Sequence, residues 1–329
     1  MPILATTASA HPNIALIKYW GDVDSCLHLP ANGSISMNLA GLTTRTKVSF
    51  DPSLPQDQFT LNDVPTIGEA LDRVGRLLNR VRQLAGITTF ARVESQNNFP
   101  ADAGIASSAS GFAALSLAAS RAAGLKLNEK DLSRLARTGS GSACRSIPGG
   151  FVEWQAGYID EDSYAYSIAP PEYWDLVDCI ALVSREEKHI SSSLGHSLAA
   201  ASLLQAGRVA DAPHRLNMCR EAINRRDFGA LADIVELDSN LMHAVMITST
   251  PTLLYWLPGT VAIMHAVRGW RNEGIPVCYT IDAGPNVHVM CPGEQAEKIT
   301  ERLGQLPGVI QVLTARPGGA ARLEHTPTN

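Results

Sequence analysis

The chain has 329 residues, with an apolar fraction of 45% and a charged fraction of 18%, as expected for a globular protein with room for two domains. Its formal charge is −5, from 27 basic and 32 acidic residues, so the composition offers no basic footprint for nucleic acid. No apolar run reaches the ~18 residues that a bilayer-spanning helix needs, so we expect no membrane partner.

Hydrophobic periodicity in the first half predicts strands and helices in mixed order. The expected elements are a strand at 43–50, a helix at 66–84, a strand ending at 92–95, a helix from Phe112, a helix at 128–137 capped by Asn128, and a strand entered through the turn at 147–150. The core face of the helix at 66–84 is expected to consist of Ile67, Leu71, Val74, Leu77, Leu78 and Val81.

The second half continues the mixture. The expected elements are a strand at 177–183, helices at 193–210, 213–224, 228–246 and 257–273, strands at 277–281 and 287–291, a helix at 295–303, a strand at 310–314, and a tail from Arg316 that frays. Such an order favours an α+β fold over a doubly wound sheet. We place the domain boundary near 180–190, with domains at 1–185 and 186–329.

The six cysteines indicate the redox environment. They include no Cys-x-x-Cys pair, and their spacing suits no zinc site. With no signal peptide evident, they predict reduced thiols in a cytoplasmic enzyme. The cysteines are Cys26, Cys144, Cys179, Cys219, Cys278 and Cys291.

A stretch of small residues from Pro100 to Gly111 lies between an expected strand and an expected helix. Backbone N–H groups at the start of a helix form a ready phosphate site, and serine hydroxyls can bind phosphate oxygens or Mg²⁺. No Gly-Lys-Ser/Thr ends the stretch, so it is not a Walker A loop. Taken alone, it could equally be a packing feature.

Four blocks together carry a resemblance: 13–21 (NIALIKYWG), 97–100 (NNFP) running into the small-residue stretch, 139–151 with its GSGSACRS and GGF segments, and 279–286 (YTIDAGPN). In this order they resemble the mevalonate diphosphate decarboxylase family of the GHMP kinase superfamily. The resemblance implies two domains with the active site in the cleft between them, the C-terminal one ferredoxin-like. It also implies ATP and Mg²⁺ as cofactors, a small mevalonate phosphate ester as substrate, and a homodimer.

The family reaction phosphorylates the 3-hydroxyl of the ester and then loses phosphate and carbon dioxide to give an alkene. By resemblance Asp282 is the catalytic aspartate, Lys18 reaches the reacting centre beside it, and Arg145 holds the substrate carboxylate. The alternatives are a turn-forming aspartate that binds its own backbone, a snorkelling surface lysine and an ordinary helix-start arginine.

The resemblance also implies binding residues. The substrate set is Tyr19, Asp22, Ser140, Ser142, Arg145, Ser192 and His196. The nucleotide set is Ala103, Gly104, Ala106, Ser107, Ser108, Ser110 and Lys188, with Ser108 as the metal ligand. The alternatives are capping or packing roles for the serines, and ion pairing of Lys188 with Glu186 or Glu187.

Two departures from the family pattern concern the outer phosphate of the substrate. Asp22 stands where diphosphate enzymes usually carry a lysine, and His196 stands where they carry methionine, after a Ser193 that supplies no cation. We therefore hypothesise that the substrate is (R)-5-phosphomevalonate and the product isopentenyl phosphate. The alternatives are a diphosphomevalonate decarboxylase, a mevalonate 3-kinase that stops after phosphorylation, and a non-catalytic binding module.

Overall fold

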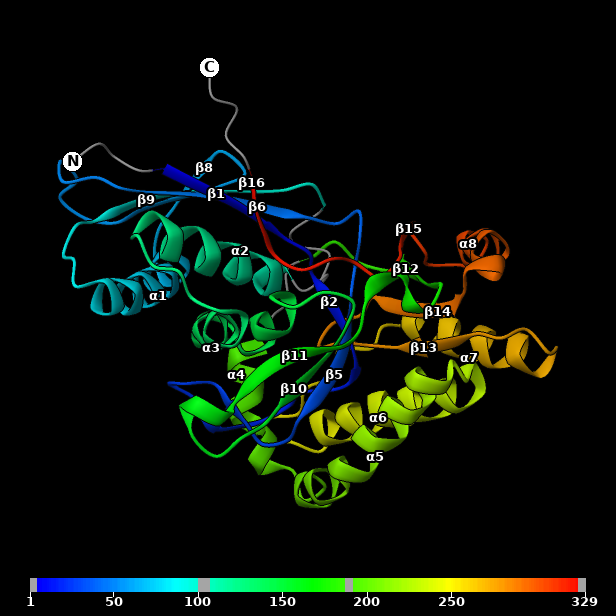
Figure 1. Cartoon of the computed structure of the whole chain (residues 1–329). Helices are drawn as coiled ribbons and strands as arrows, with labels where there is room; N and C mark the ends of the chain where they lie inside the picture. The colour runs from blue at the N-terminus through cyan, green and yellow to red at the C-terminus, as the bar shows by residue number, and fades with distance from the viewer. Residues whose placement is uncertain (1–4, 100–106, 187–191, 325–329) are drawn as a thin grey trace.

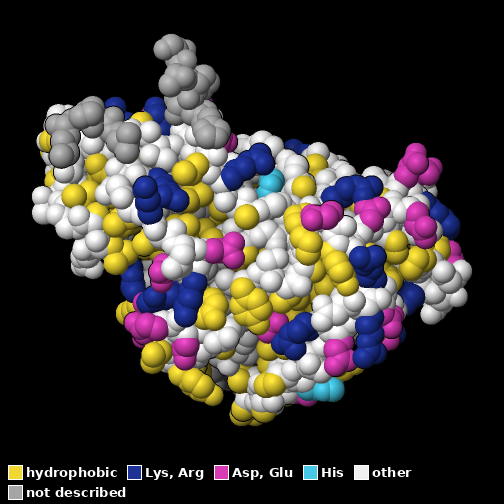
Figure 2. All heavy atoms as spheres, in the orientation of Figure 1, with side chains coloured by type: hydrophobic (Ala, Val, Ile, Leu, Met, Phe, Trp, Pro, Cys, Tyr) yellow, Lys and Arg dark blue, Asp and Glu magenta, His cyan; other side chains and the backbone are white. Residues whose placement is uncertain are grey.

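The computed structural model describes residues 5–99, 107–186 and 192–324. Three main sheets and eight α-helices of these residues form the α+β fold expected from the sequence (Figure 1). Within the described residues, no helix is both long and apolar enough to span a bilayer. On the face in Figure 2, acidic and basic side chains are interspersed.

The first sheet has six strands in the order β16-β1-β6-β9-β7-β8. Only the β7–β9 pair is parallel. Helices α1, α2 and α3 pack on this sheet through an apolar cluster of Val, Leu, Ala and Phe side chains. The bounds are β1 Ala5–Ala10, β6 Thr44–Phe50, β7 Gln58–Leu61, β8 Val64–Thr66, β9 Ala91–Asn97, β16 Arg322–Glu324, α1 Glu69–Ala85, α2 Ser107–Ala122 and α3 Glu129–Gly139.

The second sheet, in the order β11-β10-β5-β2, joins the two halves of the molecule. Its apolar face shares one core with strand β12 and helices α5 and α6. A two-stranded hairpin, β3–β4, connects β2 to β5. The bounds are β2 Asn13–Ile17, β3 Asp22–Asp24, β4 Leu29–Pro30, β5 Ser34–Asn38, β10 Phe151–Gln155 and β11 Tyr164–Ala169.

The third sheet, in the order β13-β14-β12-β15, is antiparallel. One of its faces packs on the core shared with α5 and α6, and α7 and α8 cover the other. Strand β12 is buried along its whole length because it packs on cores at both faces. The bounds are β12 Leu176–Leu182, β13 Cys278–Thr280, β14 Val287–Pro292, β15 Gln311–Ala315, α4 Ser192–Leu198, α5 Gln205–Arg225, α6 Phe228–Ile247, α7 Pro258–Asn272 and α8 Ala296–Gly304.

Four expectations about elements were wrong. The helix expected from residue 66 begins at Glu69, because Val64–Thr66 pairs as β8, and Ile67 is 82% exposed instead of facing the core. The expected helix 193–210 is interrupted near Ser202, whose hydroxyl accepts from the N–H of Leu204 and so competes with helical bonding.

The second helix of that region does not begin at 213. Pro213 lies inside the continuous α5, so the break falls before Gln205.

The tail expected to fray from Arg316 is ordered through Glu324, because β16 pairs with β1 in the register Thr7 with Glu324. The division into 1–185 and 186–329 stays a prediction.

Candidate active site

Lys18 and Asp282 are in contact although they are 264 positions apart in sequence. The Lys18 Nζ donates to Asp282 Oδ1 at 2.6 Å; the lysine side chain is 1% exposed and the aspartate 26%. Burial lowers the pKa of Lys18, while the charge and hydrogen bond of Asp282 oppose that shift. A buried lysine therefore faces a partly exposed carboxylate.

The backbone of Lys18 is held on both sides. Its N–H donates to Asp238 Oδ2 at 2.6 Å, and its carbonyl accepts from Arg208 at 2.7 Å and from Asn32 at 3.0 Å. Residue 18 follows β2, so these bonds fix the point at which the chain leaves the sheet. The side chain then points into the interior instead of snorkelling to the surface.

Arg145 lies in the short 3₁₀ helix Gly141–Ser146 and is 3% exposed. Its Nε and Nη2 donate to Asn13 Oδ1 at 3.2 and 3.1 Å, and its Nη1 donates to Ser34 Oγ at 2.6 Å. Burial lowers the pKa of Arg145, and the negative charge of Asp282 opposes the shift. Three of its five N–H bonds are committed to these partners, and the other two suit a bidentate contact with a carboxylate.

Tyr19, Asp22 and His28 form a second polar cluster near Arg145. The Tyr19 hydroxyl donates to Asp22 Oδ1, and His28 Nδ1 lies 3.4 Å from Asp22 Oδ2. Burial raises the pKa of Asp22, but the bonds from His28 and Tyr19 and the proximity of His196 outweigh it, so the net pKa is lowered. Asp22 therefore carries a negative charge at neutral pH.

His196 stacks on Tyr19, with ring centroids 4.1 Å apart, and lies against Trp20 at 4.6 Å. Its Nδ1 accepts from the N–H of Gly21 at 3.0 Å, which leaves the proton on Nε2. Burial lowers the pKa of His196 to about 4. The sequence suggested that this histidine could become a cation as pH falls, or face solvent; instead it is a neutral, stacked hydrogen-bond donor near neutral pH.

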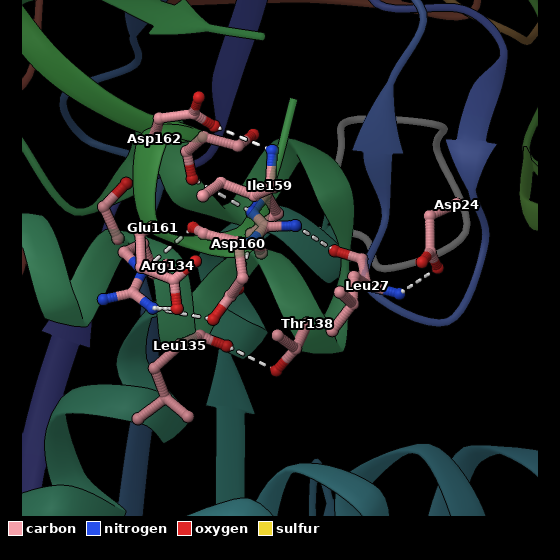
Figure 3. A network of polar contacts seen from close by, with 12 residues as sticks. Asp24, Leu27, Arg134, Leu135, Thr138, Ile159, Asp160, Glu161 and Asp162 are labelled. Atoms are coloured by element: carbon pink, nitrogen blue, oxygen red, sulfur yellow. Dashed lines mark hydrogen bonds and ion pairs between the residues drawn. The ribbon is translucent and has the colours of Figure 1, made fainter. Parts of the chain in front are cut away.

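The β3–β4 hairpin that carries Asp22 is bonded to α3, which is bonded in turn to the 3₁₀ turn Asp160–Asp162 (Figure 3). Arg137, which is fully buried, donates to the carbonyl of Leu27, to Asp160 Oδ1 and to the carbonyl of Ser163. Asp160 also accepts from Arg134 Nη2 at 2.7 Å. The hairpin tip is thus held by polar bonds from a helix that ends just before Ser140.

The start of α2 carries the described part of the expected phosphate loop. Ser108 Oγ lies 3.3 Å from Ser140 Oγ, and the buried Ser110 Oγ lies 2.6 Å from Thr44 Oγ1. A cavity of about 180 Å³ adjoins this helix start. It is lined by Thr44, Phe59, Leu61, Ala70, Arg73, Val74, Ser95, Asn97, Ser107, Ser108, Gly111, Phe112 and Leu115.

Comparison with known proteins agrees with this geometry. Residues 10–165 match a family model described as the diphosphomevalonate decarboxylase-like N-terminal domain. Residues 179–316 match one described as the mevalonate 5-diphosphate decarboxylase C-terminal domain. The chain belongs to the mevalonate diphosphate decarboxylase family.

Relatives and solved structures agree with the family assignment. The diphosphomevalonate decarboxylase of Ganoderma lucidum is 38% identical over 92% of this chain and 82% of its own. The phosphomevalonate decarboxylase of Haloferax volcanii is 33% identical over 91% of each chain. A structure described as MDDEF in complex with MVAPP, AMPPCP and magnesium is 41% identical, with a TM-score of 0.93 over 98% of this chain and 100% of that one. The chain is therefore a decarboxylase with the GHMP kinase fold.

The structure brings together six of the residues that the family resemblance singled out. Lys18, Asp282 and Arg145 form one group, and Tyr19, Asp22 and His196 form an adjoining one. Ser192 is the first residue of α4, and Ser142 contributes its carbonyl to Asn13 at 3.2 Å. Ala103, Gly104, Ala106 and Lys188 lie outside the described residues.

Sequence reasoning missed several residues around the same group. Asn13 positions Arg145, His28 faces Asp22, and Asp238 holds the backbone of Lys18. Asn13 begins the first of the decarboxylase-family blocks and could have been singled out there. Asp238 lies between apolar positions of a helix, and that context was the available signal, whereas nothing in the sequence marks His28.

Proposed function

We propose that this enzyme decarboxylates (R)-5-phosphomevalonate, with ATP, to isopentenyl phosphate, ADP, phosphate and carbon dioxide, in an alternative mevalonate pathway of isoprenoid biosynthesis. The observation that carries the choice of ester is the ionised Asp22, bound by Tyr19 and facing His28, where diphosphate enzymes usually carry a lysine.

The reaction centre is assigned to Lys18, Asp282 and Arg145. Asp282 accepts the proton of the 3-hydroxyl as that oxygen attacks the γ-phosphorus, and ADP leaves. The bond from the carboxylate carbon to the adjacent CH₂ carbon then breaks, and its electron pair forms the alkene as the 3-phosphate departs. Lys18 balances the charge at Asp282, and Arg145 orients the carboxylate until it leaves as carbon dioxide.

The polar cluster of Tyr19, Asp22 and His28, here called the Tyr19–Asp22 cluster, carries a charge that favours the monophosphate. Two unit charges ~4 Å apart at an effective dielectric constant of ~20 interact by about 4 kcal/mol before screening. Asp22 would repel a second phosphate, whereas the neutral His196 Nε2–H can donate to a single one. The phosphomevalonate decarboxylase of Haloferax volcanii shows that the family includes this specificity.

Nucleotide binding is assigned to the start of α2. The N–H groups of its first turn suit anionic phosphates, and the cavity beside Phe112 suits the base. Mg²⁺ would be held by phosphate oxygens and the Ser108 hydroxyl, ligands of the kind this cation prefers. ATP with Mg²⁺ supplies the phosphoryl group. The related complex with AMPPCP and magnesium supports this assignment.

The second candidate is diphosphomevalonate decarboxylation, the activity named for most of the relatives. A kinase that stops after phosphorylation is the third. The joint presence of Lys18, Arg145 and Asp282 in one group argues against it, because together they supply the groups that the complete decarboxylation needs.

The discriminating experiment compares kcat/KM for the two esters while carbon dioxide and ADP are measured together. We expect a clear preference for the monophosphate and equal amounts of the two products. A preference for the diphosphate would overturn the choice of ester. ADP without carbon dioxide would instead indicate a kinase.

Three further proposals accompany this function. We propose a homodimer, a cytoplasmic location and a domain boundary at 185/186. Sedimentation velocity tests the dimer. Separate expression of 1–185 and 186–329 tests the boundary. Because β12 pairs with β14 and β15, and β1 pairs with β16, a cut at 185/186 removes β12 from its sheet partners and β16 from β1, so instability of both pieces would count against this boundary.

A further inference from the structure

Helix α6 buries polar side chains beside the Lys18–Asp282 pair. Asp238 and Ser239 are fully buried and His243 is 1% exposed, while most of their helical neighbours are apolar core residues. A buried polar group is costly unless it is hydrogen-bonded, so such residues are expected to have specific partners. The partners in this case are all backbone groups next to the reaction centre, together with one arginine.

One end of this set holds the lysine. Asp238 Oδ2 accepts from the N–H of Lys18 at 2.6 Å, and its Oδ1 accepts from Arg215 Nε at 2.7 Å. Asp238 therefore has a charged partner on α5 and a backbone partner at the end of β2.

The other end holds the aspartate. Ser239 Oγ accepts from the N–H of Ile281 at 3.0 Å, and His243 Nε2 donates to the carbonyl of Ile281 at 3.3 Å. A carbonyl oxygen can only accept, so His243 carries its proton on Nε2. Positions 239 and 243 are one helical turn apart and lie on one face of α6, which lets both reach the same peptide segment.

We infer that Asp238, Ser239 and His243, here called the α6 clamp, are positioning residues that set the distance between Lys18 and Asp282. The two reacting side chains follow the ends of strands β2 and β13, which belong to different sheets and are not paired with each other. One helix bonds to the backbone at both strand ends and so holds Lys18 Nζ and Asp282 Oδ1 within the observed 2.6 Å of each other. A misplacement of 1 Å at a reaction centre can cost about 100-fold in rate.

Charge also constrains the clamp. Burial, together with the positive charge of Lys18, lowers the pKa of His243 to about 4. The neutral imidazole keeps a donor for Ile281 without placing a second cation beside the lysine. Its ring also packs on Trp256, with centroids 5.0 Å apart, which fixes its orientation.

The inference rests on the proposed roles of Lys18 and Asp282, and the test uses whichever ester the wild type turns over faster. We expect His243→Phe, which keeps an aromatic ring but no donor, to lower kcat at least tenfold while KM changes less than threefold. His243→Gln restores an N–H donor near the Nε2 position and should recover most of the loss. Equal impairment of both variants, or wild-type kcat in His243→Phe, would overturn the inference.

A serine pair provides the matched control. Ser239→Ala removes the acceptor for Ile281, whereas Ser116→Ala removes an equally buried hydroxyl on α2 that bonds to its own helix at Phe112. We expect lower kcat only in the first. If His243→Phe does not fold, the comparison of Ser239→Ala with Ser116→Ala still tests the positioning role of the α6 clamp. Equal kcat in these two variants would refute that role. A wild type that decarboxylates neither ester would refute the proposed function instead.

Discussion

The two polar clusters of the candidate site balance charge in different ways. At the reaction centre, a buried lysine faces a partly open carboxylate, and neighbouring backbone bonds hold both. At the other cluster, the charge of Asp22 is bound by a neutral hydroxyl and faces His28, while His196 is kept neutral. Under the proposed function, the first arrangement serves the decarboxylation itself, and the second selects the ester and can vary with the substrate.

Substitution at the reaction centre should have the largest effect on turnover. Asp282→Asn keeps the shape of the side chain but removes the proton acceptor and the charge that pairs with Lys18. We expect turnover to fall by about 10²–10⁴-fold, the usual contribution of a general base, with ATP binding retained. Carbon dioxide release and nucleotide titration measure the two effects. Unchanged turnover would contradict the role of Asp282.

A change at the Tyr19–Asp22 cluster should alter selectivity more than rate. Asp22→Lys exchanges one negative charge for one positive, and we expect the ratio of kcat/KM for the diphosphate over the monophosphate to rise about tenfold or more. Asp22→Asn, which only neutralises the charge, should give a smaller rise. Glu301→Lys on the exposed side of α8 makes the same charge change elsewhere and is the control. A ratio equal to that of the control would show that Asp22 does not discriminate between the esters.

The smallest effect concerns pH and stability. The folded-state pKa of His196 is about 4 and its ordinary value is 6.5, so between these values the unfolded chain binds a proton that the folded chain does not. Stability should therefore fall as pH drops from about 6.5 to about 4. His196→Asn keeps an acceptor for the N–H of Gly21. In this variant the free energy of unfolding, measured by urea titrations at several pH values, should depend less steeply on pH. His243 contributes a similar term, so the slope should not vanish; an unchanged slope would contradict the assignment.

Local patterns allowed most elements to be predicted. The helix at 128–137 begins as expected, with Asn128 accepting from the N–H of Asp131, because capping depends on neighbours in sequence. Errors occurred where tertiary contacts decide. The strand β8 depends on β7, and β16 depends on a partner more than 300 positions away.

The site shows the same limit. Asp282 and Lys18 could be identified through family blocks, but their contact could not be derived from spacing, because it depends on how two sheets and α6 pack. His196 was the clearest example: its sequence position suggested a switchable cation, yet stacking and the bond from Gly21 hold it neutral. Burial and partner geometry are set by the whole fold and cannot be deduced from local sequence.

The pairing of β16 with β1 has a consequence for how the protein is made. Strand β1 is synthesised more than 300 residues before β16, and β6, which follows it more closely, pairs with one of its edges. The other edge of β1 has no partner strand until Arg322–Glu324 has been synthesised. Throughout translation, the nascent first sheet therefore has an open edge of the kind that invites pairing with other chains. Strand β16, which has only three residues, covers that edge once it has been synthesised.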